Sequence, residues 1–146
     1  GAMIRLRLIG LAFLCVLVVP FPVIAGDFDG SKPLLFAAID VIECGANGEC
    51  SRVSPESIAL SQFFKIDFNK TKIFPVGTSQ ETKSTTIENR ELIDGKLILQ
   101  GAEDGVEGVR DGVGWTMAIA EETGKAVLTA SGDQVGFVVF GACTPL

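Results

Sequence analysis

The sequence predicts an all-β domain in which an antiparallel meander closes into a small barrel. Three observations predict this fold. Short runs alternate apolar with polar residues, which is the period of a half-buried strand. Gly, Asn and Asp residues separate these runs at the spacing of an antiparallel meander. No stretch sustains the 3.6-residue period of a long helix. A β-sandwich is the alternative, because it also reduces the exposed edges of a meander.

The first half of the chain contributes three predicted strands and one helical turn. The stretch 34–44 is apolar and partly β-branched, which predicts a mostly buried strand, with a helix as the alternative. Ser54-Pro55 is a helix-start signal, but no helical period follows it, so a single turn is expected near Pro55, over 55–58. The alternation over 63–68 predicts a half-buried strand, and 72–74 is expected to pair back on it.

The second half is expected to be a run of hairpins. Asp94-Gly95 lies between two strand-like runs, 85–93 and 96–100, and is the strongest short hairpin signal in the chain. Residues 101–114 are expected to form a glycine-rich acidic loop. The last three strands are expected over 115–120, 125–130 and 135–140. The final one carries apolar residues on both faces, which predicts a central strand or one covered on both sides.

The N-terminus has the pattern of a secretory signal. Gly1-Ala2 is interpreted as the scar of a cleaved tag and is left out of the fold prediction. Arg5 and Arg7 precede an apolar run from Leu8 to Val19, and the small residue Ala25 follows. A basic start, a short apolar stretch and a small residue are typical of a signal peptide, so we expect cleavage after Ala25.

A membrane anchor is the alternative interpretation of the same segment. The apolar run of twelve residues would reach about 18 Å as a helix, whereas the hydrocarbon core is about 30 Å thick. The sequence therefore predicts a tag scar plus signal peptide over 1–25 and a single β-domain over 26–146. The expected location is the periplasm or the extracellular medium.

The composition favours some partners and disfavours others. Without the two arginines of the leader, ten basic residues face eighteen acidic ones, a net charge of −8. This charge repels phosphate backbones and anionic lipid surfaces, so neither nucleic acid nor, after leader cleavage, a membrane is an expected partner. The chain has no histidine and no tyrosine, which excludes serine-histidine and cysteine-histidine catalysis. We expect a protein that is not an enzyme and has no cofactor.

The stretch "ECGANGEC" holds two of the three cysteines that remain after leader cleavage, Cys44 and Cys50; the third is Cys143. An oxidising compartment predicts a disulfide, and the short Gly/Asn loop favours Cys44–Cys50. Pairing of either with Cys143 remains open. Three thiolates without histidine make an incomplete zinc site, and the spacing differs from that of dithiol redox motifs.

The acidic stretch "GAEDGVEGVRDGVG" is a weak candidate for calcium binding. Glu103, Asp104, Glu107 and Asp111 offer oxygen ligands, and the glycines permit tight wrapping. The spacing matches neither an EF-hand nor a calcium-binding repeat. A solvated surface loop is the simpler interpretation, and no metal is expected.

Trp115 is the only tryptophan, and Gly114 precedes it. A glycine beside a large aromatic residue permits close approach of another backbone or a ligand. We expect Trp115 to belong to the core rather than to a binding site.

Three stretches together resemble a family of small exported proteobacterial proteins with no assigned function. They are "ECGANGEC", "FFKIDF" and the closing "GWTMAIAEETGKAVLTASGDQVGFVVFGACTPL". Relatives in that family often carry a cysteine where this chain has Phe36. The resemblance therefore implies that Cys143 pairs with the first strand in them, that it has lost its partner here, and that Cys44–Cys50 is the disulfide. It implies no activity, cofactor or catalytic residue.

Two functions follow from these observations as hypotheses. The first is a non-catalytic periplasmic module that binds a small apolar ligand or a partner protein. The alternative is an acidic envelope or inhibitor protein that binds a cationic protein such as a lysozyme, by analogy of size and charge alone.

Overall fold

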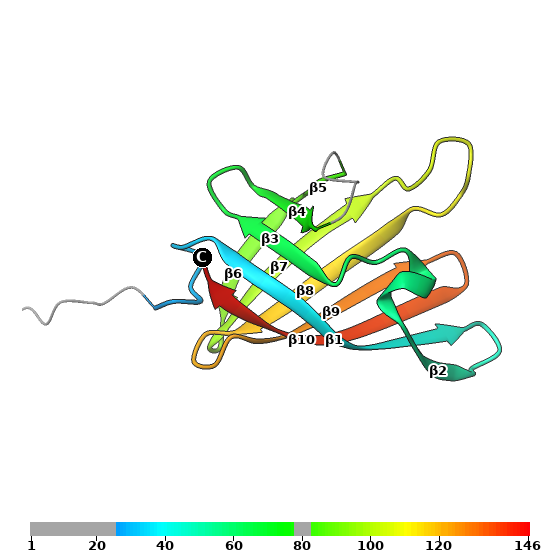
Figure 1. Cartoon of the computed structure of the whole chain (residues 1–146), viewed down its shortest axis with the longest axis horizontal. Helices are drawn as coiled ribbons and strands as arrows, with labels where there is room; N and C mark the ends of the chain where they lie inside the picture. Colours follow the sequence, from blue (N-terminus) through cyan, green and yellow to red (C-terminus); the bar gives the residue numbers. More distant parts are fainter. Residues whose placement is uncertain (1–25, 78–82) are drawn as a thin grey trace, which may run out of the picture.

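The computed structural model describes residues 26–77 and 83–146. The predicted signal segment over 1–25, with its cleavage point and Cys15, lies outside the described residues. The described residues form ten strands and one 3-10 turn, η1 (Figure 1). In chain order they are β1 (Leu34–Gly45), β2 (Cys50–Val53), η1 (Pro55–Ile58), β3 (Phe63–Asp67), β4 (Lys72–Val76), β5 (Thr85–Thr86), β6 (Asn89–Ile93), β7 (Lys96–Glu103), β8 (Val113–Ala120), β9 (Lys125–Gly132) and β10 (Val135–Pro145).

All ten strands belong to one antiparallel sheet that curls through 289° into a half-barrel. The strand order is β5-β4-β3-β1-β10-β9-β8-β7-β6, and β2 pairs with the far half of β1. The sheet is thus a meander in which the first and last strands pair with each other. This confirms the predicted all-β antiparallel fold and the single turn near Pro55.

The seam of the half-barrel lies between β5 and β6, the two ends of the strand order. The sequence predicts one strand over 85–93, whereas the structure breaks it at Ile87 and Glu88. Because of this break, β5 pairs with β4 on one side of the seam and β6 pairs with β7 on the other. Ile87 N donates to Thr71 O and Glu88 N donates to Gln100 O, each at 2.8 Å.

Several strands are longer than the sequence predicts. β10 runs to Pro145 because β1 pairs with it along its whole length, from Leu34↔Pro145 to Gly45↔Val135. β7 continues to Glu103, inside the stretch predicted as a loop. The predicted Asp-Gly hairpin is confirmed, with Asp94 and Gly95 at φ of 48° and 70°, as a two-residue turn of this kind requires.

The core occupies the concave face of the sheet. The inward side chains of β7 and β8 include Leu97, Leu99, Met117 and Ile119, all 1% exposed or less. Phe36 packs there against Gly141, where a Cβ would lie 2.5 Å from the ring. The other buried apolar residues are Leu34, Ala38, Val41, Ile66, Phe68, Ile73, Ile87, Trp115, Ala126, Val139 and Cys143.

The segment 26–33 closes one end of the half-barrel, where the β8–β9 turn and the C-terminus also lie (Figure 1). Phe28 packs against the core beside Gly124, which has a φ of 72° and no room for a side chain. Arg90 of β6 donates to Gly30 O at 3.3 Å and lies over the ring of Phe68. The short, Gly- and Asp-rich composition of this segment is typical of a flexible start, but the structure shows a folded one.

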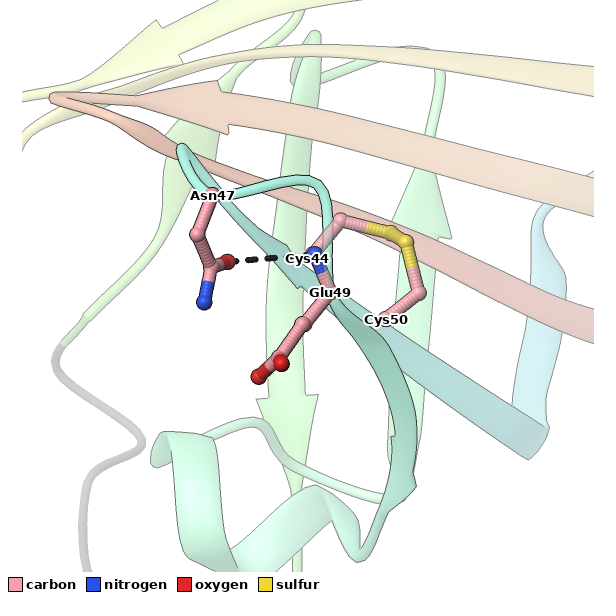
Figure 2. Close-up of a disulfide and its surroundings, with 4 residues drawn as sticks. All are labelled: Cys44, Asn47, Glu49 and Cys50. Carbon is pink, nitrogen blue, oxygen red and sulfur yellow. Dashed lines mark hydrogen bonds between the residues drawn. A yellow bond between two sulfur atoms is a disulfide. The ribbon is translucent and has the colours of Figure 1, made fainter.

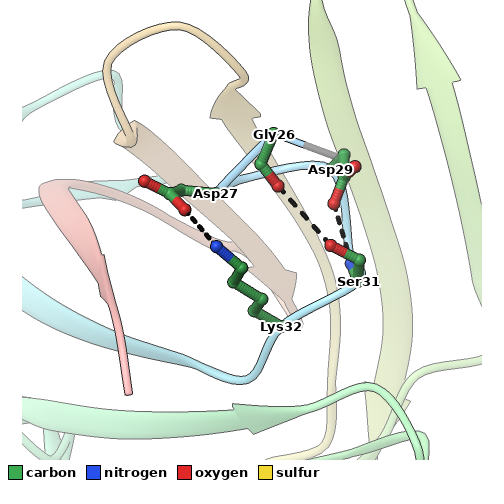
Figure 3. A network of polar contacts seen from close by, with 5 residues as sticks. All are labelled: Gly26, Asp27, Asp29, Ser31 and Lys32. Atoms are coloured by element: carbon green, nitrogen blue, oxygen red, sulfur yellow. Dashed lines mark hydrogen bonds and ion pairs between the residues drawn. The ribbon is translucent and has the colours of Figure 1, made fainter. Parts of the chain in front are cut away.

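Polar contacts within this segment hold its turn (Figure 3). Ser31 N donates to Asp29 Oδ1 at 2.9 Å, and this contact with Ser31 lowers the pKa of the Asp29 carboxyl. Lys32 pairs with Asp27, whose hydrogen bond and negative charge raise the pKa of the lysine. Both pairs are exposed, so their main effect is on the local conformation.

Within residues 26–77 and 83–146, nothing covers the outer face of the sheet around Ile39 and Phe140. β10 is central, between β1 and β9, as predicted, yet Phe140 on its outer face is 45% exposed. A β-bulge between Ala38 and Asp40 leaves Ile39 beside it, 67% exposed. β10 is therefore central in the sheet, as the apolar residues on its two faces predict. Its inner face is buried, whereas Phe140 on its outer face is exposed.

Candidate functional site

A cavity of about 390 Å³ opens at the end of the half-barrel away from Phe28. The inner faces of β3, β4, β8 and β9 form its walls, and η1 borders it. Its lining residues are Glu56, Ala59, Leu60, Ser61, Phe64, Ile73, Pro75, Lys83, Thr85, Glu103, Val113, Trp115, Met117, Leu128 and Ala130.

The walls of this cavity are apolar because inward positions alternate with outward ones along each strand. Trp115, Met117 and Val113 come from β8, and Leu128 and Ala130 from β9. Among the described residues no buried side-chain nitrogen or oxygen lacks a hydrogen-bond partner. The deep part of the cavity is thus suited to apolar groups.

Hydrogen bonds through Thr85 fix the indole of Trp115 in the wall of the cavity. Trp115 Nε1 donates to Thr85 Oγ1 at 3.1 Å, and the Thr85 hydroxyl donates to Ala102 O at 3.4 Å. The contact crosses the seam from β8 to β5 and satisfies the polar end of the indole. Trp115 is 7% exposed, so it belongs to the core, as predicted, and it also lines the cavity.

The glycine that makes room for Trp115 is Gly101, whereas the close approach that the sequence suggests at Gly114 is not seen among the described residues. A Cβ at Gly101 would lie 2.5 Å from Trp115 Cζ2 and 2.4 Å from Thr86 O. A Cβ at Gly114 would meet nothing within 4 Å. The reason is the strand alternation: Trp115 points inward over its cross-strand partner Gly101, whereas Gly114 faces outward.

Among the described residues, three charged side chains lie at the mouth of the cavity. Glu56 comes from η1, Lys83 from the segment before β5, and Glu103 from the end of β7. All three are exposed, and none forms an ion pair with another described residue. The mouth therefore carries two carboxylates and one ammonium group.

The predicted disulfide Cys44–Cys50 is present and closes the β1–β2 hairpin (Figure 2). The two cysteines are directly opposite in the register. Asn47 Oδ1 accepts from Glu49 N at 3.1 Å, and Gly48, with a φ of 81°, completes the turn. The hairpin extends from the main sheet and lines no part of the cavity.

Cys143 is buried in the core and forms no disulfide with another described residue. Burial raises the pKa of its thiol to about 12. Its cross-strand partner on β1 is Phe36. A cysteine at position 36, as the resemblance implies for relatives, would therefore face Cys143.

The four weak calcium candidates do not converge on one point. Asp111 Oδ1 accepts from Val106 N at 2.8 Å and so braces the loop itself. Glu103, Asp104 and Glu107 are all exposed, but only Glu103 lines the cavity. In the part of the chain that the structure describes, no three His, Cys, Asp or Glu side chains are grouped to hold a metal ion.

Comparison with known proteins supplies no further assignment. No family model, no curated protein and no solved structure matches the chain. The resemblance to exported proteobacterial proteins thus stays a prediction. Within residues 26–77 and 83–146, no helix has the length and apolar character needed to cross a bilayer.

Proposed function

We propose that the protein is a non-catalytic binding module that holds a small apolar ligand inside the half-barrel. The observation that carries this proposal is the cavity of about 390 Å³, with walls formed by residues such as Phe64, Trp115, Met117 and Leu128. Ligand pockets commonly measure about 300–1,000 Å³ and combine apolar walls with a few polar groups. The interior of a small barrel is otherwise filled by side chains.

The module is proposed to act outside the cytoplasm, in the periplasm or after secretion. The leader pattern over 1–25 supports this location. The Cys44–Cys50 disulfide supports it independently, because disulfides persist mainly in oxidising compartments.

A series of straight-chain alcohols from hexanol to decanol tests the proposal. Trp115 is the only tryptophan and lines the cavity, so its fluorescence reports on occupancy. Each added methylene should tighten binding about fourfold, equivalent to about 0.8 kcal/mol, until the cavity is full. If none of the alcohols changes the emission or raises the melting temperature, the cavity is not a binding site.

Two matched variants distinguish binding inside the cavity from binding elsewhere on the surface. Ala130→Phe places a ring among the lining residues and should abolish alcohol binding. Ala118→Phe makes the same change on the outer face of β8, between the inward Met117 and Ile119, and should leave binding intact. Equal loss of binding in both variants would indicate a general effect on folding.

Binding of a partner protein through the outer face is a second candidate function. Ile39 and Phe140 are neighbours there and are 67% and 45% exposed, and adjacent exposed apolar side chains of this size are typical of interaction surfaces. The acidic net charge favours a cationic partner such as a lysozyme. Calorimetric titration with a lysozyme at low and high salt tests this candidate. Binding should weaken with salt and with Phe140→Ser, but not with Leu92→Ser on β6; no heat at low salt would exclude that partner.

A further inference from the structure

The inward side chains change in character along the half-barrel, and this change indicates the class of ligand. Along β7, Leu97 and Leu99 are fully buried at the closed end, Gly101 follows, and Glu103 reaches the mouth. The same direction along β8 leads from Ile119 to the less buried Val113. An apolar depth with a charged rim matches a molecule with an apolar tail and a charged head.

The charge at the mouth specifies the sign of that head. Glu56 and Glu103 outnumber Lys83, and none of the three is paired with a described residue. The turn from β7 to β8 adds to the field: beyond Glu103, residues 104–112 hold three carboxylates and Arg110, a further net charge of −2. The surrounding field therefore attracts a cation and repels an anion.

Both carboxylates at the mouth belong to residues in regular secondary structure. Glu103 is the last residue of β7 and pairs with Val113 of β8. Glu56 lies in the first turn of η1, which Ser54 caps by accepting from Ser57 N. A head group at the mouth would thus meet negative charge from two separate elements, η1 and β7.

We propose that the ligand is a cationic amphiphile, with an alkyl or similar apolar tail among Trp115, Met117 and Leu128 and an ammonium-type head beside Glu56 and Glu103. This inference rests on the proposed function. A fatty carboxylate has the wrong sign for this mouth, since Lys83 is the only cation among the described lining residues.

The test compares decylammonium, decanol and decanoate with the full chain at neutral pH, below micelle-forming concentrations. The three probes share one tail and differ only in the charge of the head. Decylammonium should bind about two- to fivefold tighter than decanol, and decanoate weaker than decanol, because an exposed ion pair is worth up to about fivefold in affinity. The difference should shrink at high salt.

Glu103→Gln tests the role of the mouth directly. It should reduce decylammonium binding several-fold and leave decanol binding unchanged. Glu122→Gln, in the β8–β9 turn at the opposite end, is the matched control and should change neither.

The outcomes distinguish this inference from the function on which it rests. Equal binding of the three probes, or tightest binding of decanoate, would overturn the cationic head and leave the apolar cavity as a binding site. Binding of none of them would overturn both. Preference for the ammonium probe that Glu103→Gln removes would support both.

Discussion

Gly101→Ala tests whether close packing of Trp115 on β7 holds the cavity wall. The new Cβ would lie 2.4 Å from Thr86 O and 2.5 Å from Trp115 Cζ2. Ordinary contacts of this kind are longer by about 1 Å, so either the indole or the backbone of β5 must move. The indole cannot move far without losing its 3.1 Å hydrogen bond to Thr85 Oγ1.

The expected change in stability is the difference of two opposing effects. Overpacking a close-packed interior costs about 1–3 kcal/mol. Replacing glycine by alanine in a strand returns about 0.5–1 kcal/mol. The net loss in the free energy of unfolding should therefore be about 1–2 kcal/mol, which lowers the Tm by about 3–10 °C for a domain of this size.

Urea unfolding followed by Trp115 fluorescence measures this loss, and Gly114→Ala is the matched control. Gly114 is the neighbouring glycine on β8 with nothing within 4 Å of its Cβ position, so alanine there should be neutral or stabilising by up to about 1 kcal/mol. Gly101→Ala should also shift the native emission of Trp115 and change decanol affinity. Equal stability of the two variants, with unchanged emission, would refute the proposed packing of Trp115 on Gly101.

Three other predictions concern the Cys44–Cys50 disulfide, the buried Cys143 and Phe28 at the closed end of the half-barrel. Cys44→Ser together with Cys50→Ser should lower the free energy of unfolding by about 2–2.5 kcal/mol, from the entropy of closing a short loop, while decanol binding persists; calorimetric melting and Trp115 titration check this. Cys143 has a folded pKa of about 12 against a usual value of 9.0, so its contribution to stability is complete below pH 9 and is lost as the pH rises from 9 towards 12. Above pH 9 the wild type should lose stability faster than Cys143→Ala, by up to about 1.4 kcal/mol per pH unit, and peptide mapping should find Cys143 labelled by a thiol reagent only after denaturation. Phe28→Ala should cost about 1.5–2.5 kcal/mol, because this ring is half-buried, yet leave decanol affinity unchanged; a large loss of affinity would mean that the two ends of the half-barrel are coupled.

Local sequence patterns were sufficient to predict the fold class and the Cys44–Cys50 disulfide. The Asp94-Gly95 turn and the alternation in β3 and β8 depend on neighbours along the chain, so the sequence alone indicates them. The Cys44–Cys50 pair spans a turn whose residues favour closure. Each of these features is complete within about ten residues, and tertiary packing did not override them.

Features that depend on distant partners were not visible in the sequence. β2 is short and exposed apart from its last residue, and it forms because the far end of β1 offers an edge. The break between β5 and β6 exists because the same segment pairs with β4 on one side and β7 on the other. The cavity also escaped prediction, because its wall residues are of the same types as core residues and only the curvature of the sheet decides whether space remains between them.

One misplaced boundary accounts for both misassigned residues of the candidate site. The sequence predicts that the strand starting at Lys96 ends at Gln100, because glycines and acidic residues follow, and this places Gly101 and Glu103 in a loop. The structure extends β7 to Glu103 by pairing it with β8, and strand alternation then points both residues inward with Leu97 and Leu99. Gly101 thereby makes room for Trp115, and Glu103 becomes part of the cavity mouth instead of the solvated surface loop that the sequence predicts. The inward residues of β7 are thus Leu97 and Leu99 at the closed end, Gly101 beneath the Trp115 ring, and Glu103 at the open end. That order within one strand is the reason to expect a ligand with an apolar tail and a cationic head.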